Sequence, residues 1–315
     1  MFGSVILEIA IGVIFIYLLL SLICSALNEW IARLLSLRST TLEKGIQSLL
    51  NEAKGGEFTK KLYEHSLIKV FTQPGWLDKL FKREPKPSYI PSRTFTLALL
   101  DTLGIAYSKK GLKGIDKIQN NELRNSLQIL LKEAGHDLEK AIKNIESWFN
   151  DTMDRISGWY KRKVQLIILV LALLVSVMLN ADTFMIANGI SSNDTMRTAI
   201  VAFAQEVSKQ PLSADAKTSL KRIEEIQKNF QNIQLPIGWS KRPKKLPKDE
   251  LYVRDPREVP QGFTGWLLKV IGLLFTTIAI SLGGPFWFDV LSKFINLRQT
   301  GGRPEPISKE EIKKG

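Results

Sequence analysis

The stretch DLEKAIKNIESWFNDTMDRISGWYKRKVQLIILVLALLVSVMLNADTFMIA, residues 137–187, decides how this chain folds. Its first half, up to Lys163, is polar and rich in charge, and its second half, from Val164, is almost entirely apolar. Only Gly158, and no proline, interrupts the helical pattern. At a rise of about 1.5 Å per residue, a single helix of this length would reach about 75 Å. We therefore predict one long helix that lies half in water and half in a bilayer.

Two further apolar blocks accompany this one. The first is VILEIAIGVIFIYLLLSLICSAL, Val5–Leu27, and the last is WLLKVIGLLFTTIAISLGG, Trp266–Gly284. Each is long enough to cross about 30 Å of hydrocarbon, and so is the middle block, Val164–Leu179, when it is extended to Ala187. No Lys or Arg precedes the first block, which favours an uncleaved membrane helix over a signal peptide. The sequence thus predicts an all-α membrane protein with three transmembrane helices.

The basic residues that flank the blocks predict their orientation, because Lys and Arg gather on the cytoplasmic side of a membrane. The first block is followed by Arg33, the second is preceded by the run 161–163, and the third is followed by Lys293 and Arg298. All three flanks give the same answer. We expect the N-terminus outside, a helical cytoplasmic domain continuous with the second membrane helix, and a cytoplasmic C-terminus.

Composition shifts along the chain predict six segments. These are transmembrane helix 1 (1–30), a cytoplasmic helical domain (31–163), transmembrane helix 2 (164–187), an extracytoplasmic helical hairpin with a Pro- and Lys-rich strap (188–262), transmembrane helix 3 (263–284), and an interfacial helix with a disordered cytoplasmic tail (285–315). The sequence Gly283-Gly284-Pro285 permits a kink where the third block ends.

A heptad-like seam runs along the polar half of the long helix. Its apolar positions are alternately four and three residues apart, at Leu138, Ile142, Ile145, Phe149, Thr152, Ile156 and Trp159. The seam either packs against the other helices of the cytoplasmic domain or joins copies of the chain in a coiled-coil stalk. The short seam and its central threonine favour the first interpretation.

A proline-rich segment within the cytoplasmic domain mixes basic and aromatic residues. A candidate lipid-surface patch on it comprises Trp76, Lys79, Lys82, Arg83 and Lys86. Such residues bind the interface of an anionic leaflet, at about 1 kcal/mol for each base. The alternative is a solvated connection whose aromatic side chains cover the core, and we favour it.

The composition argues against several classes of function. The net charge is +13, but basic residues beside membrane segments indicate anionic lipid more directly than nucleic acid. One cysteine and two histidines provide neither a disulfide framework nor a cluster typical of zinc. No phosphate loop, nucleotide fingerprint, zinc motif or nucleophile elbow is present. We therefore expect a protein that is not an enzyme and holds no cofactor or metal.

Ionisable residues inside two membrane blocks form the first candidate site. Glu8 and Lys269 each lie about one turn from the outer end of a predicted helix, and Asn180 ends the second helix on the same side. Ionisable groups within membrane helices pair or face water. We predict a Glu8–Lys269 pair with Asn180 nearby, which either locks the helices together or belongs to a proton or ion path. The alternative is that the two side chains snorkel to the interface separately.

The second candidate site lies at the inner interface. Asn28 and Glu29 follow the first block, and Lys161, Arg162 and Lys163 precede the second. Because the two helices cross the membrane in opposite directions, these residues are expected at one depth.

Two stretches together carry a resemblance. WYKRK, residues 159–163, and SLGGPFWFDVLSKFINLR, residues 281–298, resemble an uncharacterised group of bacterial three-span membrane proteins. The resemblance implies the inner membrane of a bacterium and brings no known activity.

Two functions remain open at the level of the sequence. The first is a non-enzymatic membrane anchor or scaffold, whose helical segments bind protein partners on either side of the bilayer. The second is a homo-oligomeric channel or membrane-perturbing effector, which would need several copies of a chain with so few spans.

Overall fold

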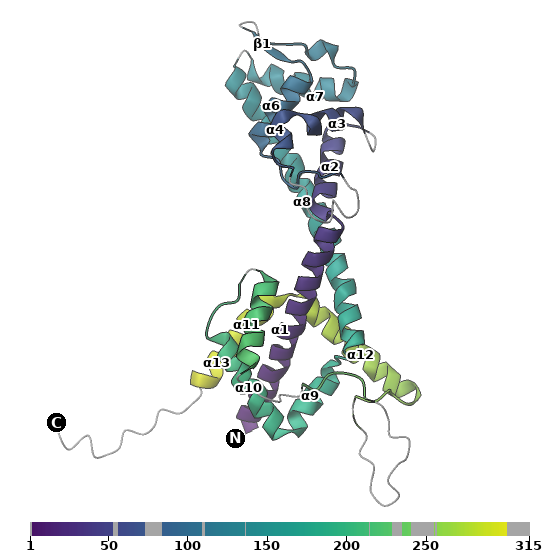
Figure 1. The fold of residues 1–315 in the computed structure, drawn as a ribbon, viewed down its shortest axis with the longest axis vertical. Coiled ribbons are helices and arrows are strands. Elements are labelled where there is room, and N and C mark those ends of the chain that lie inside the picture. Colours follow the sequence, from purple (N-terminus) through teal and green to yellow (C-terminus); the bar gives the residue numbers. More distant parts are fainter. Residues whose placement is uncertain are drawn as a thin grey trace, which may run out of the picture. The chain divides into compact units, whose positions relative to one another are not determined.

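The computed structural model describes residues 2–52, 56–72, 84–108, 111–135, 137–213, 215–228, 235–240, 255 and 257–300. The chain forms two compact units. Unit 1 comprises residues 1–29 and 165–315, and unit 2 comprises residues 30–164. Two helices contribute to both units, α1 (Phe2–Leu34) and α8 (Leu138–Met178) (Figure 1).

The described residues are predominantly helical, as the sequence predicts. The β-structure among them comprises an isolated bridge between Ser240 and Glu258 and a short antiparallel hairpin of β1 (Ala106–Ser108) and β2 (Gly111–Lys113).

Unit 2 has its own hydrophobic core. Its elements besides α1 and α8 are α2 (Leu37–Leu49), α3 (Glu57–Glu64), α4 (Ser66–Lys69), α6 (Ser92–Thr102), the hairpin, η1 (Ile115–Lys117) and α7 (Asn121–Ala134). Asn120 joins two of them, because its side chain accepts hydrogen bonds from Glu122 N and Leu123 N while its Nδ2 donates to Leu50 O. It therefore caps α7 and holds it against the end of α2.

The seam of α8 packs inside this core. Ile145 and Phe149 are buried, and the Phe149 ring stacks on that of Phe95 with the centroids 4.2 Å apart. Farther along, Ile156 lies so close to Gly45 that a Cβ there would overlap it. The interpretation of the seam as a core strip is confirmed as far as Ile156. Trp159, the last position, is exposed.

The long helix is confirmed up to Met178, but its predicted extension to Ala187 is wrong. Asn180 adopts a left-handed backbone conformation with φ +48°, which ends the helix. A second helix, α9 (Thr183–Ser192), then begins at an angle of 47° to α8. Asn tolerates the left-handed region better than most residues do, so it can end a helix even within an apolar run.

Unit 1 is built around the N-terminal part of α1. α10 (Asp194–Ser208) runs parallel to it: Arg197 bonds to Glu8, Ile200 lies beside Gly12, and Phe203 packs edge-on against Phe15 with the centroids 5.0 Å apart. α11 (Ala216–Gln227) folds back against α10.

The two C-terminal helices of unit 1 are α12 (Gly262–Ser281) and α13 (Gly284–Thr300). The predicted kink separates them, and Gly283 there has φ +89°. The sequence predicts that the second of these helices lies at the membrane surface. Instead, α13 runs back along α1, with Gly284 beside Leu22 and Arg298 bonded to Glu8.

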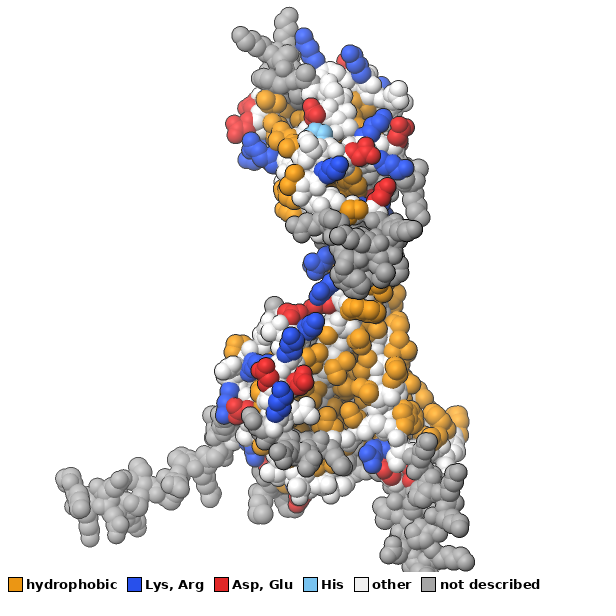
Figure 2. All heavy atoms as spheres, viewed as in Figure 1, with side chains coloured by type: hydrophobic (Ala, Val, Ile, Leu, Met, Phe, Trp, Pro, Cys, Tyr) orange, Lys and Arg blue, Asp and Glu red, His pale blue; other side chains and the backbone are white. Residues whose placement is uncertain are grey.

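In the part of the chain that the structure describes, two helices, α1 from Val5 onward and α12, are long and apolar enough to cross a membrane, and α8 with α9 would form a third, bent span. The apolar part of α8 and the length of α12 expose large hydrophobic side chains, including Leu166 at 63%, Leu268 at 61% and Phe263 at 82%. Figure 2 shows these side chains gathered over α8 and α12 of unit 1. Such a surface is typical of contact with lipid.

Candidate functional site

The break between α8 and α9 organises a buried polar cluster in unit 1. Asp182 begins α9, and its Oδ1 accepts hydrogen bonds from Phe184 N at 2.9 Å and Met185 N at 3.4 Å. A carboxylate at a helix N-terminus satisfies free backbone N–H groups and interacts favourably with the helix dipole. The break therefore places a negative charge in the buried interior of unit 1.

Residues 235–240 close the break from the other side. Gly238 N donates to Leu179 O at 2.7 Å, and Trp239 Nε1 donates to Val177 O at 3.0 Å. Asn180 Nδ2 donates in turn to Gly238 O at 2.8 Å and to Arg257 O at 3.2 Å. Carbonyls at the end of a helix have no partner within the helix, and the bond from Gly238 N supplies one to Leu179 O, so this segment stabilises the broken helix.

Lys269 of α12 provides the countercharge. Its Nζ lies 3.4 Å from Asp182 Oδ2, and the two side chains are only 5% and 8% exposed. The same Nζ is 3.6 Å from Met185 Sδ and 5.5 Å from the centre of a Trp239 ring. Gly272 allows this approach, because a Cβ at that position would overlap the Asp182 carboxylate.

Hydroxyl groups beginning at Thr183, the residue after Asp182, form bonds across the helices. Tyr17 Oη and Thr183 Oγ1 are 2.7 Å apart, and Thr183 Oγ1 and Thr276 Oγ1 are 2.9 Å apart. Ser176 and Thr277 form a separate contact of 2.9 Å between α8 and α12. These bonds join α1, α8, α9 and α12, and each hydroxyl gains a partner that a hydrocarbon environment would not supply.

A second ionic cluster lies beside the start of α1. Glu8 accepts from Arg197 Nε at 3.2 Å and from an Arg298 guanidinium nitrogen at 2.9 Å. Arg197 is buried and also bonds to Asp194 at 2.7 Å and to the carbonyl of Ser191 at 3.2 Å. The cluster therefore joins α1, α10 and α13.

The prediction of a Glu8–Lys269 pair is wrong, because the two residues belong to different clusters. Glu8 pairs with two arginines, and Lys269 pairs with Asp182. The side chains of Asn180 and Lys269 both contact Met185 Sδ. Asp182, Arg197 and Arg298 were missed as site residues. The sequence did place Asp182 two residues after Asn180, in a position where an N-cap is expected.

Two other predicted sites are the inner-interface cluster and the lipid-surface patch. Asn28 and Glu29 belong to unit 1, whereas the exposed residues Lys161, Arg162 and Lys163 belong to unit 2, so the inner-interface cluster stays a prediction. Trp76, Lys79, Lys82 and Arg83 lie outside the described residues. Lys86, the last member of the lipid-surface patch, bonds to both oxygens of Glu43, at 2.7 and 2.8 Å.

Unit 2 carries a cavity of about 560 Å³ on α8. Its lining includes the apolar residues Leu42, Phe149 and Met153. The polar residues of the lining are Arg38, Thr41, Ser88, Ser92, Asn150, Asp154, Ser157 and Tyr160. Such a cavity suits an amphipathic ligand or segment, since it offers both apolar contact and hydrogen bonds.

Tyr63, also in unit 2, is partly buried, and its buried hydroxyl has no hydrogen-bond partner within the described part of the chain. Burial, and to a lesser extent the nearby carboxylate of Glu43, raises the pKa of this phenol. A neutral, unpaired hydroxyl is a structural feature and not a reactive group.

No group of three or more His, Cys, Asp or Glu residues that could hold a metal ion occurs among the described positions. Comparisons with models of protein families, with curated proteins and with solved structures gave no match for this chain. The geometry of the two ionic clusters therefore indicates what they can do. Both ionic clusters lie between helices and join them.

Proposed function

We propose that this chain is a non-enzymatic integral membrane protein that anchors a helical domain and presents it to protein partners. The observation that carries the proposal is the difference between the two units. Unit 2 has a closed hydrophobic core, whereas unit 1 exposes large apolar side chains along α8 and α12. The exposed apolar surface of unit 1 is suited to lipid, and the closed core of unit 2 is suited to water.

We infer three spans, formed by α1, by α8 with α9, and by α12. The flanking charges support an orientation with the N-terminus outside and unit 2 in the cytoplasm. The resemblance noted above supports a bacterial inner membrane with an anionic inner leaflet. The Arg298–Glu8 pair supports one change from the sequence-based topology: we place the end of α13 on the same side as Glu8, not in the cytoplasm.

The two polar clusters fit an anchoring role. Asp182–Lys269 and Glu8–Arg197 each hold two helices of unit 1 together through side chains that are largely buried. Pairs of this kind fix one arrangement of helices, because an unpaired charge in the same place would be costly. This use needs neither a cofactor nor a reaction.

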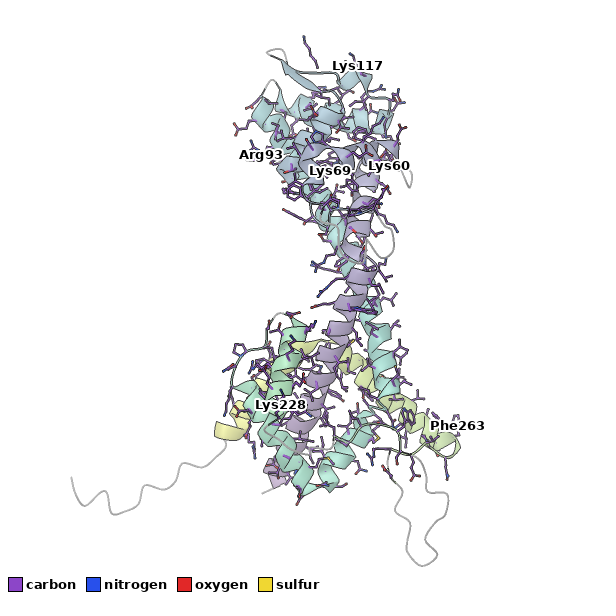
Figure 3. The ribbon with its side chains drawn as sticks, viewed as in Figure 1. Lys60, Lys69, Arg93, Lys117, Lys228 and Phe263 are labelled. Atoms are coloured by element: carbon purple, nitrogen blue, oxygen red, sulfur yellow. The ribbon has the colours of Figure 1, made fainter. Side chains whose placement is uncertain are left out.

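The full chain, extracted in a mild detergent and weighed by native mass spectrometry, tests the proposal. We expect a different protein bound in a fixed ratio. The variant Met153→Glu, which adds a charge to the lining of the cavity in unit 2, should reduce that ratio if the partner binds there. The exposed control Lys117→Glu, also in unit 2 (Figure 3), should not. A chain that carries no partner from its native membrane would contradict the scaffold.

A homo-oligomeric channel is the second candidate function. The observation that favours it is the charged outer surface of α11 and α13, which both pack against α10 in unit 1.

A further inference from the structure

α13 follows the apolar part of α1 for most of its length. Gly284 lies beside Leu22, the Trp287 and Tyr17 rings have centroids 4.8 Å apart, and Arg298 bonds to Glu8. α1 is also the more apolar of the two single-helix candidate spans, with a mean hydropathy of 2.7 against 1.8 for α12. Wherever α1 crosses a bilayer, α13 therefore lies at the same depth.

The middle of the outer face of α13 is polar, between exposed Phe286 and Leu297 near the ends of the helix. Asp289, Lys293 and Asn296 recur at intervals of four and three residues, so they share one face of the helix, and all three are exposed. α11 adds more charge on this side of unit 1, because α10 packs against both helices. Its exposed charged residues are Lys217, Lys221, Glu224, Glu225 and Lys228.

The opposite side of unit 1 is apolar. Figure 2 shows the charged side chains over α10 and α11 and the hydrophobic ones over α8 and α12. Lys228, at the end of α11, and Phe263, at the start of α12, lie on opposite sides of the unit in Figure 3. Unit 1 thus has one charged surface and one apolar surface at the same depth. A single copy surrounded by lipid would need an apolar surface on every side at that depth.

Lipid does not suit the polar face. A charged side chain at the centre of a membrane helix costs about 2.5–3.5 kcal/mol even on the lowest scale, and this face carries several. The face needs water or another protein surface. Because it carries both signs, with Lys and Glu side by side on α11 and Asp and Lys on α13, it complements itself better than it complements a partner of one sign.

We propose that the polar face of α11 and α13 lines an aqueous path through the bilayer, which is closed by further copies of this chain. The apolar face of α8 and α12 then faces lipid, and Lys293 and Asp289 border the path. Small hydrated ions are the solutes that a mixed-charge path of this kind admits. The inference rests on the proposed membrane function, since it requires α1 to span.

Thiol labelling of the full chain in liposomes tests the inference. Cys24 is the chain's single cysteine and is buried, so Cys24→Ser provides a background without thiols. Lys293→Cys then places a thiol on the polar face, and Leu274→Cys places a matched one on exposed α12. A membrane-impermeant, negatively charged methanethiosulfonate is the probe, because it reacts with the thiolate that forms in water.

We expect Lys293→Cys to be labelled at least about tenfold faster than Leu274→Cys, because a thiolate forms in water and not in lipid. Cross-linked protein should run as a discrete homo-oligomer, and labelling at position 293 should reduce ion flux from the liposomes. Slow labelling at both positions, which means lipid or a dry interface, would overturn the path. Fast labelling at 293 in a monomer would overturn its closure by copies. Fast labelling at 274 as well would instead refute the membrane crossing on which both proposals rest.

Discussion

Removing Lys269 is expected to destabilise unit 1 severely. Its ammonium lies 3.4 Å from Asp182, and both side chains are nearly inaccessible, with 5% and 8% exposure. At this distance and an effective dielectric constant of about 20, the attraction is about 5 kcal/mol. Lys269→Met keeps the length of the side chain but leaves the carboxylate buried and unpaired, which costs about 3–5 kcal/mol.

The double variant Asp182→Asn/Lys269→Met separates the ion pair from other effects. Asn is as good a helix N-cap as Asp, so the hydrogen bonds that begin α9 can persist without the charge. We expect the free energy of unfolding of the double variant to lie within about 1 kcal/mol of that of the natural protein, because replacing both members of a buried pair is often neutral. The coupling energy of the cycle should then reach about 2 kcal/mol or more.

Thermal unfolding of the full chain in a mild detergent, followed by circular dichroism, measures these effects. A loss of about 4 kcal/mol corresponds to about 8–16 °C in Tm for a unit of this size. Lys61→Met is the matched control, because Lys61 pairs with Glu57 on the surface of unit 2, where the side chains are 62% and 87% exposed. It should cost no more than about 0.5 kcal/mol. If Lys269→Met is as mild as this control, or if the double variant is as unstable as the two single variants added together, the reasoning is refuted.

Three further predictions concern single positions and use the same unfolding assay. Gly272→Ala should destabilise unit 1 by about 1–3 kcal/mol, because its Cβ would overlap the Asp182 carboxylate. Gly158→Ala, in open space on α8, should instead stabilise the protein by about 0.5–1 kcal/mol. Equal effects of the two substitutions would contradict the packing of Gly272 against Asp182. Asn120→Ala removes the cap of α7 and should lower the free energy of unfolding by about 1–2 kcal/mol. A loss below a few tenths of a kcal/mol would argue against the capping role. Burial raises the pKa of Tyr63, so the natural protein should lose stability as pH rises above about 10, the pKa of an unfolded tyrosine. Tyr63→Phe should lose less over that range and be at least as stable at neutral pH, and parallel pH curves for the two proteins would exclude this account.

Features that depend on local pattern could be predicted from the sequence. The three apolar blocks became α1, the apolar part of α8 with α9, and α12, because a long apolar run determines helix and burial by itself. The seam through Ile145 and Phe149 was found by its helical spacing, and the kink at Gly283 by the conformational freedom of glycine.

Features that depend on distant contacts could not be predicted. Glu8 and its partner Arg197 are separated by 189 residues, and Glu8 and Arg298 by 290, so no spacing rule connects them. The return of α13 along α1 follows from the packing of Trp287 against Tyr17 and of Gly284 against Leu22. The break at Asn180 was missed because the surrounding run is apolar enough to continue a helix, and only the left-handed conformation of that residue ends it.

The central claim is that the apolar face of α8 and α12 is in contact with lipid. Spin labels placed at Val170 and Ile278, both exposed on these helices, test it most directly in liposomes that contain the full chain with Cys24→Ser. The relaxation of each label by oxygen, which concentrates in hydrocarbon, is compared with its relaxation by a water-soluble nickel complex. The account predicts high access for oxygen and low access for nickel at both positions, with the reverse at exposed Lys117 of unit 2. Nickel access at Val170 and Ile278 equal to that at Lys117 would contradict it.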